Sequence, residues 1–142
     1  MTLLSTVRIT ATAPGLFSVL QNGQGQAAVL NQNNSQNFGN NPATRGSVIQ
    51  IFATGGGDTA PPLLPGEAAP ASGNPLVLTN VQPTVTIGGS QAVLKFSGMV
   101  PGWVGLWVIN VEIPQDTPAG PPVPLTVTAD GVRSNLVTIA VQ

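Results

Sequence analysis

The chain lacks His, Cys and Tyr, and only 6% of its residues are charged. General acid–base catalysis, activated nucleophiles and transition-metal sites draw mainly on these missing residue types. We therefore expect a non-catalytic protein with no cofactor and no metal site. The four basic and five acidic side chains are Arg8, Arg45, Lys95, Arg133, Asp58, Glu67, Glu112, Asp116 and Asp130.

The scarcity of charge also narrows the range of partners. A net charge of −1 offers no basic surface for nucleic acid. No apolar run approaches the roughly 18–20 residues of a membrane span. The first seven residues are too short for a signal peptide and have no positive flank, so we expect an excised or mature fragment, or a protein that is not secreted by a cleaved leader.

Glycine and proline punctuate the whole chain. Seventeen Gly and fourteen Pro residues divide the apolar residues into short blocks. Gly adopts backbone angles that other residues avoid, and Pro ends helices and central strands. The 142 residues therefore predict one domain of many short elements, long enough to bury a core without disulfides.

Alternation of polar and apolar residues predicts strands in the first half of the chain. We expect them over residues 5–12, 16–20, 27–30 and 47–53. Asn22-Gly23 predicts a hairpin turn, because both residues accept positive φ. The near-continuous apolar run 47–53 is typical of a strand buried on both faces.

The second half predicts two further hairpins around a central strand. Gly88-Gly89 joins the strands expected at 84–87 and 92–96, and Asp130-Gly131 joins those expected at 124–128 and 136–141. Residues 103–113 supply a strand centred on 106–111, which lies between the two hairpins. About nine short strands with long irregular loops at 31–46 and 55–75 predict an all-β, antiparallel β-sandwich.

Several phrases are more specific than any pattern. In order, they are Ala13-Pro14-Gly15-Leu16-Phe17, Gly25-Gln26-Ala27-Ala28-Val29-Leu30-Asn31-Gln32, Pro42-Ala43-Thr44-Arg45-Gly46-Ser47-Val48, Phe52-Ala53-Thr54-Gly55, Pro101-Gly102-Trp103-Val104-Gly105-Leu106, Val108-Ile109-Asn110-Val111 and Ser134-Asn135-Leu136-Val137-Thr138-Ile139-Ala140-Val141. From about Thr6 onward the chain resembles the Solibacter-type uncharacterised C-terminal domain family, which ends large secreted or surface proteins of Acidobacteria. The resemblance implies an immunoglobulin-like, extracellular or cell-surface module, and it transfers no catalytic residue.

The two ends of the chain carry similar phrases. Residues 5–11 read like residues 135–141, and within arrays of the resembled family such a phrase closes a domain. We therefore expect residues 1–12 to form a strand that belongs to, or pairs with, a neighbouring module, and residues 13–142 to form the sandwich. The expected partners are other protein modules or copies of the chain itself. The candidate assembly residues are Thr6, Val7, Arg8, Ile9 and Thr10.

Two other functions stay open. Trp103 and Trp107 lie four residues apart, so on one strand they would share a face and offer a stacking platform for a surface glycan. The competing interpretation places them in the core. A third interpretation is an accessory subunit of a larger complex, since low charge and apolar edges suit a permanent interface.

Weaker hypotheses concern the few charged residues and a glycine run. The acidic residues lack the spacing of a calcium loop, and Glu112 with Asp116 is only a formal candidate for a glycosidase pair. Lys95 is either an edge charge that opposes aggregation or a crosslinking lysine. Gly55-Gly56-Gly57-Asp58 lacks the Lys-Ser/Thr ending of a phosphate loop, so we reject that function.

Overall fold

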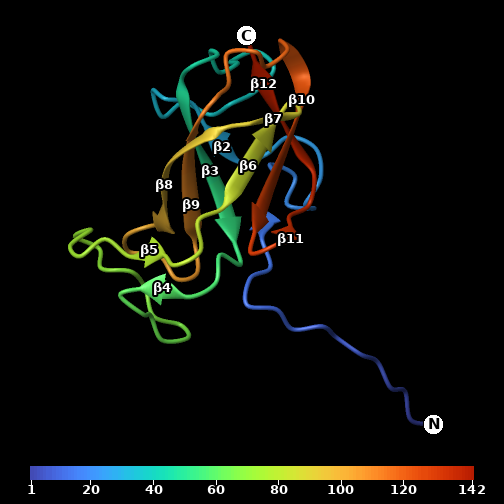
Figure 1. Ribbon diagram of the computed structural model, residues 1–142, viewed down its shortest axis with the longest axis vertical. Helices are drawn as coiled ribbons and strands as arrows, with labels where there is room; N and C mark the ends of the chain where they lie inside the picture. The colour runs from blue at the N-terminus through green and yellow to red at the C-terminus, as the bar shows by residue number, and fades with distance from the viewer.

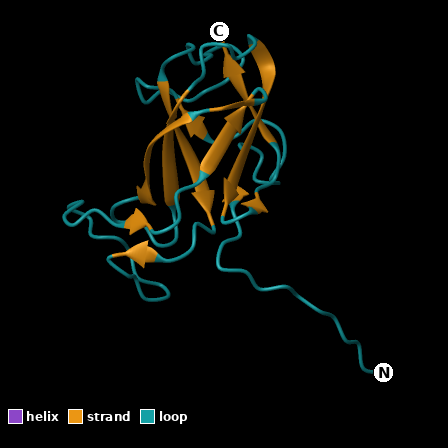
Figure 2. Cartoon of the chain, viewed as in Figure 1, coloured by secondary structure: helices purple, strands orange, loops and turns teal.

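The computed structural model describes residues 1–142, which form strands, turns and loops without a helix (Figure 2). Twelve strands build two antiparallel sheets, so the all-β sandwich predicted from the sequence is confirmed. The first sheet contains seven strands: β1 (Gly15–Leu16), β2 (Val29–Leu30), β3 (Val48–Thr54), β4 (Thr59–Ala60), β5 (Leu78–Thr79), β8 (Val93–Met99) and β9 (Trp107–Glu112). The second contains five: β6 (Thr84–Ile87), β7 (Ser90–Gln91), β10 (Gly120–Ala129), β11 (Val132–Arg133) and β12 (Val137–Val141).

The strand order places β3, β9 and β8 at the centre of the first sheet (Figure 1). There the order is β1-β3-β9-β8-β5-β4, and β2 also pairs with β3. In the second sheet the order is β11-β10-β6-β7, and β12 also pairs with β10. The inner faces of the two sheets enclose one cluster of 21 buried residues, to which β3 contributes Ile49 and Ile51 and β10 contributes Leu125 and Val127.

Strand β3 departs from the predicted burial. Ile49, Ile51 and Ala53 are fully buried, whereas the alternating Val48, Gln50 and Phe52 are only partly buried. The expectation of a strand buried on both faces is therefore wrong. Successive side chains of a strand point to opposite faces, and only one face of this sheet meets the other sheet.

The hairpin predicted around Gly88-Gly89 is correct only in its first part. These glycines have φ of 59° and 90° and connect β6 to β7. The chain then leaves this sheet after Ala92, and β8 pairs with β9 in the first sheet. The buried Ala92 still donates a backbone hydrogen bond to Val85, so pairing with β6 ends where the strand changes sheets. Periodicity alone does not distinguish a hairpin from such a crossing.

The other two turns differ in how well local sequence predicted them. Asp130 and Gly131 have φ of 49° and 76°, as the expected hairpin turn requires. In the first hairpin the positive φ angles fall on Gln21, Gly23 and Gly25, and Asn22 has none. There the turn is longer, and its amides are held by a serine hydroxyl at its start.

Candidate interaction site

The first eleven residues form an arm that extends away from the sandwich (Figures 1 and 2). None of them belongs to a strand or takes part in a backbone–backbone hydrogen bond. Every arm residue is exposed, including five large apolar side chains: Met1, Leu3, Leu4, Val7 and Ile9. An extended segment with free backbone groups and exposed apolar side chains is a template for pairing with another chain.

The predicted assembly residues lie in the middle of this arm. Val7 and Ile9 are 78% and 92% exposed and alternate with Thr6, Arg8 and Thr10. In an extended backbone the two apolar side chains lie on one face and the three polar ones on the other. The arm thus has the pattern of a half-buried strand but finds no partner within its own chain, and its pairing with a neighbour stays a prediction.

The arm is attached to the sandwich by a fixed base. Thr12 is buried and its hydroxyl donates a hydrogen bond to the Ala129 carbonyl over 2.7 Å. The Ala13 amide donates to the Gly55 carbonyl over 2.9 Å. These two bonds hold the chain to both sheets, because Gly55 follows β3 and Ala129 ends β10. The free segment is therefore residues 1–11, and the fixed part of the chain begins at Thr12.

The Gly55-Gly56-Gly57 run has a structural task at this base. Gly55 and Gly57 have φ of 81° and 85°. A Cβ at Gly55 would overlap the Ala13 carbonyl oxygen, and one at Gly57 would come within 3.0 Å of the Ala11 carbonyl oxygen. Gly56 lies against the indole of Trp107, where a Cβ would come within 2.9 Å of the ring. The run lets two chain segments cross closely, because Gly has no Cβ and adopts positive φ.

A groove of about 1190 Å³ adjoins the base of the arm. It contains no charged residue, and its walls come from the start of β1, the first hairpin turn and the segment before β12. Phe17 and Leu136 are its exposed apolar side chains, at 45% and 60%. The lining residues are Pro14, Gly15, Leu16, Phe17, Ser18, Gln21, Asn22, Gly23, Gln24, Thr54, Asn135 and Leu136.

Asn135 fixes the walls of this groove. Its side-chain amide donates to the carbonyl oxygens of Leu16 and Gly23, over 3.0 and 2.7 Å. Its carbonyl oxygen accepts from the Leu16 amide over 2.7 Å. One side chain thus satisfies both backbone groups of Leu16 and ties the first hairpin to the second sheet. No local pattern of residues indicated this groove, since Leu16 and Asn135 on its walls lie more than 100 residues apart.

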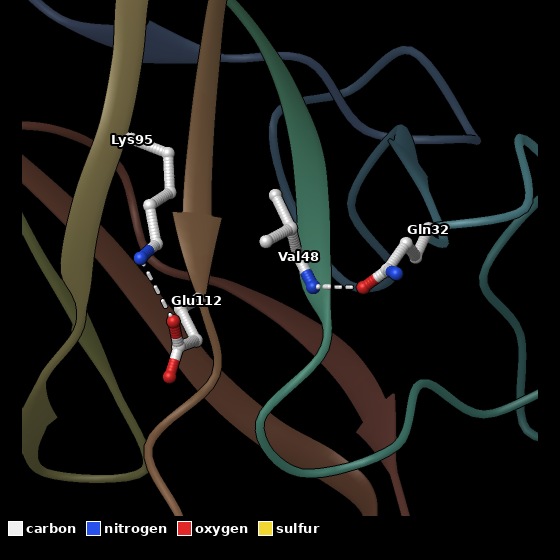
Figure 3. A network of polar contacts seen from close by, with 4 residues as sticks. All are labelled: Gln32, Val48, Lys95 and Glu112. Carbon is white, nitrogen blue, oxygen red and sulfur yellow. Dashed lines mark hydrogen bonds and ion pairs between the residues drawn. The ribbon is translucent and has the colours of Figure 1, made fainter.

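Amide side chains close one side of the sandwich. Asn37 is fully buried, accepts a hydrogen bond from the Ala140 amide over 2.8 Å and donates to the Ala140 carbonyl over 2.9 Å. The Gln32 carbonyl oxygen accepts from the Val48 amide over 2.9 Å (Figure 3). The Asn- and Gln-rich loop therefore covers the outer edges of β12 and β3, where free backbone groups would otherwise attract another strand.

The first part of β8 has a free edge, because β5 pairs with β8 only at Gly98, and this edge is protected in another way. Lys95 occupies a β-bulge, since the register of β8 against β9 shifts between Leu94 and Phe96. Its ammonium group lies 3.0 Å from a carboxylate oxygen of Glu112 (Figure 3). Both side chains are partly exposed, at 45% and 37%. A bulge and a lysine are two known devices against edge-to-edge association, so this position matches the edge-charge interpretation of Lys95.

The two tryptophans do not form a common platform. Trp107 in β9 is 1% exposed, and its indole N–H donates to the Ser97 hydroxyl over 2.8 Å. Trp103 lies in the turn before β9 and is 61% exposed. The core interpretation is therefore correct for Trp107 only. Beside Trp103, Val104 lines a second groove of about 680 Å³ that also includes Asp58, Glu67 and Asn80 among its walls.

The acidic residues are dispersed. Four of the five are exposed, and Glu112 is partly buried in its pair with Lys95. Asp116 accepts a hydrogen bond from the Ser90 hydroxyl over 3.0 Å, and Glu67 accepts from the Leu64 amide over 2.7 Å. Asp130 forms the last hairpin turn. No three His, Cys, Asp or Glu side chains gather where they could hold a metal ion.

The chain contains no helix of the length and apolarity needed to cross a membrane. No model of a known protein family matches it, and neither a curated protein nor a solved structure does.

Proposed function

We propose that this protein is a non-catalytic structural or interaction module that assembles with other protein chains through its N-terminal arm. The observation that carries the proposal is the contrast between arm and body. The body closes or protects its strand edges with amide side chains, a bulge and a lysine. The arm leaves its backbone unpaired and Val7 and Ile9 almost fully exposed.

The energetics favour a partner that also supplies backbone hydrogen bonds. Burying Leu3, Leu4, Val7 or Ile9 stabilises a complex by about 1.5–3 kcal/mol per side chain. Ordering the backbone costs about 1–2 kcal/mol per residue. Over the seven residues from 3 to 9 the two terms are similar in size. Apolar burial alone therefore does not hold the arm, and the partner must accept and donate hydrogen bonds along it.

Deletion of residues 1–10 tests the proposal. The truncation keeps Thr12 and Ala13, whose hydrogen bonds fix the base, so the sandwich should stay folded. Sedimentation from micromolar to near-millimolar concentration should show association for the full chain and none for the truncated chain. Association unchanged by the truncation, or a full chain that stays monomeric throughout, would contradict the proposal.

A point variant separates side-chain recognition from the mere presence of a tail. Val7→Ser with Ile9→Ser removes the apolar face of the arm but keeps its length. Thr6→Ser with Thr10→Ser changes the opposite face and serves as the matched control. We expect the first pair to lose association and the control pair to keep it.

The family and location proposals rest on the resemblance described from the sequence. We propose an immunoglobulin-like module of the Solibacter-type family that acts in the extracellular space or at the cell surface, and the β-sandwich architecture is compatible with this. Fractionation of the native host, with antibody detection of the chain, tests the location. Detection only in the cytoplasmic fraction would contradict it.

A carbohydrate-binding function is the second candidate. Trp103 is favoured for this role by its 61% exposure and by its position next to a groove whose walls include Asp58, Glu67 and Asn80. Trp107 is excluded because it is buried. Binding on a glycan array that disappears in Trp103→Ala and persists in Leu20→Ala would support this candidate. Silence across a broad array would contradict it.

An accessory subunit remains the third candidate. The low charge of the chain and its exposed apolar arm suit a permanent interface. Purification of the native protein at fixed stoichiometry with one other chain would distinguish this function from a self-assembling module.

A further inference from the structure

We propose that the arm of one copy binds the groove beside the arm base of a second copy, and that the arm of the second copy binds the groove of the first. The inference rests on the proposed function, since it names the partner and the receiving surface of the same arm. Both surfaces belong to this chain. Each is incomplete without the other.

The receiving surface follows from the state of the strand edges. The outer edge of β12 is covered by Asn37, and the Gln32 side chain occupies the edge of β3. Strand β8 carries the bulge at Lys95, and the two-residue β4 is followed by two prolines. An incoming strand therefore finds no long, free edge on the body of a second copy.

The groove has the chemistry that the arm requires. Phe17 and Leu136 offer apolar surface for the Val7 and Ile9 face. The exposed side chains of Gln21, Asn22 and Gln24 supply amide donors and acceptors for an extended backbone. No lining residue is charged, and the arm carries a single charged side chain, on its polar face. The groove is also preformed, because the Asn135 amide fixes its walls.

Geometry favours exchange over folding back. The arm base is held by the bonds of Thr12 and Ala13, and the arm projects away from the body (Figure 1). The residues that follow, 14–18, are themselves a wall of the groove. To enter its own groove, the arm would have to reverse sharply at residue 11. In a second copy no reversal is needed.

Two-fold symmetry makes both contacts at once. The groove and the arm base are adjacent on each copy, so two copies facing each other place each arm near the opposite groove. An extended strand rises about 3.3 Å per residue, so residues 3–11 reach roughly 30 Å. That length suffices to cross a neighbouring groove. Each copy then contributes the same arm and the same groove.

Substitution in the groove tests the inference in the full chain. Leu136→Glu places a charge at an exposed apolar wall without disturbing the core. A tenfold loss at each of the two symmetric contacts predicts a dimer dissociation constant raised about a hundredfold. Leu20→Glu is the matched control, because Leu20 is 77% exposed and lies outside the groove lining. Sedimentation equilibrium measures the dimer dissociation constant of both variants.

Mixing provides a complementary readout. The chain lacking residues 1–10 keeps its groove, and Leu136→Glu keeps its arm. Under exchange, two variants that fail to assemble alone should associate with each other through one arm–groove contact. If Leu136→Glu dimerises like the unmodified chain while the truncation does not, the inference is overturned and the proposed function stands. If the truncation makes no difference, the proposed function itself fails.

Crosslinking distinguishes a second copy from the same copy. The chain has no cysteine, so introduced thiols report without background. Val7→Cys with Leu136→Cys should yield a covalent dimer on mild oxidation, and Val7→Cys with Leu20→Cys should not. A closed monomer in place of the dimer would show that the arm folds back and would overturn the inference.

Discussion

Asn37 is a buried polar side chain whose removal should destabilise the sandwich. Its amide lies fully buried at the edge of β12 and bonds both backbone groups of Ala140. It also donates to the Asn31 side chain over 2.9 Å and accepts from the Gln26 amide over 3.1 Å. Asn37→Ala would leave the Ala140 amide buried without a partner, whereas the Ala140 carbonyl keeps the hydrogen bond that it accepts from the Ala43 amide over 2.9 Å.

The expected loss of stability follows from this one orphaned amide. An unsatisfied buried backbone group costs about 1–3 kcal/mol, so Asn37→Ala should lower the free energy of unfolding by about 1–3 kcal/mol. A domain of this kind is stable by about 5–15 kcal/mol. The variant should therefore fold but unfold at lower denaturant. With a slope near 2 kcal/mol/M, the urea midpoint falls by about 0.5–1.5 M.

Trp107 fluorescence follows this unfolding from inside the core, since its indole is 1% exposed. Trp103→Phe removes the signal of the exposed tryptophan in both chains. Asn40→Ala in the same loop is the matched control, because Asn40 is exposed and should change stability by less than about 0.5 kcal/mol. A loss below about 1 kcal/mol in Asn37→Ala would refute the edge-capping argument.

Acid should partly rescue Asn37→Asp. The introduced carboxyl would be buried with no cation beside it, so burial raises its pKa above the value of about 3.9 in the unfolded chain. A raised folded-state pKa means that protonation favours the fold. The stability deficit relative to the unmodified chain should therefore be smallest below pH about 4 and grow as the pH rises through the folded-state pKa. Urea titrations at several pH values measure it.

Three further predictions test other contacts. Gly55→Ala combines a positive φ with a steric overlap and should destabilise the fold by more than about 2 kcal/mol. Gly25 also has a positive φ but open space around it, so Gly25→Ala should cost only about 1–2 kcal/mol. Thermal unfolding measures both variants. Trp107→Phe loses a buried hydrogen bond to a serine hydroxyl and should cost about 1–3 kcal/mol by urea unfolding. Lys95→Ala breaks an exposed ion pair with Glu112 and should cost less than about 1 kcal/mol, with greater aggregation on light scattering.

Local chemistry predicted part of the fold. Asp130-Gly131 forms the expected hairpin because its turn depends on two adjacent residues that accept positive φ. Alternation also predicted the strands of the second sheet. The change of sheet after Ala92 was missed, because a strand pattern does not say which neighbour the strand joins.

The candidate site was likewise predicted only in part from the sequence. The arm residues 6–10 were identified from alternation and from the repeated phrase at the C-terminus. The groove was not, since Asn135 reaches Leu16 across 119 positions of sequence. The hydrogen bonds of Asn37 to the edge of β12 were missed for the same reason, because its partner Ala140 lies 103 residues away. Side chains that replace strand partners leave no periodic signal in the sequence.

Hydrogen exchange along the arm tests the central claim most directly. In the isolated chain the amides of residues 6–10 have no backbone partner. If the arm assembles with another copy, these amides should exchange at free-peptide rates at low concentration and become protected as the concentration rises, with the same midpoint as dimer formation in sedimentation. Exchange at free-peptide rates at every concentration would contradict assembly through the arm.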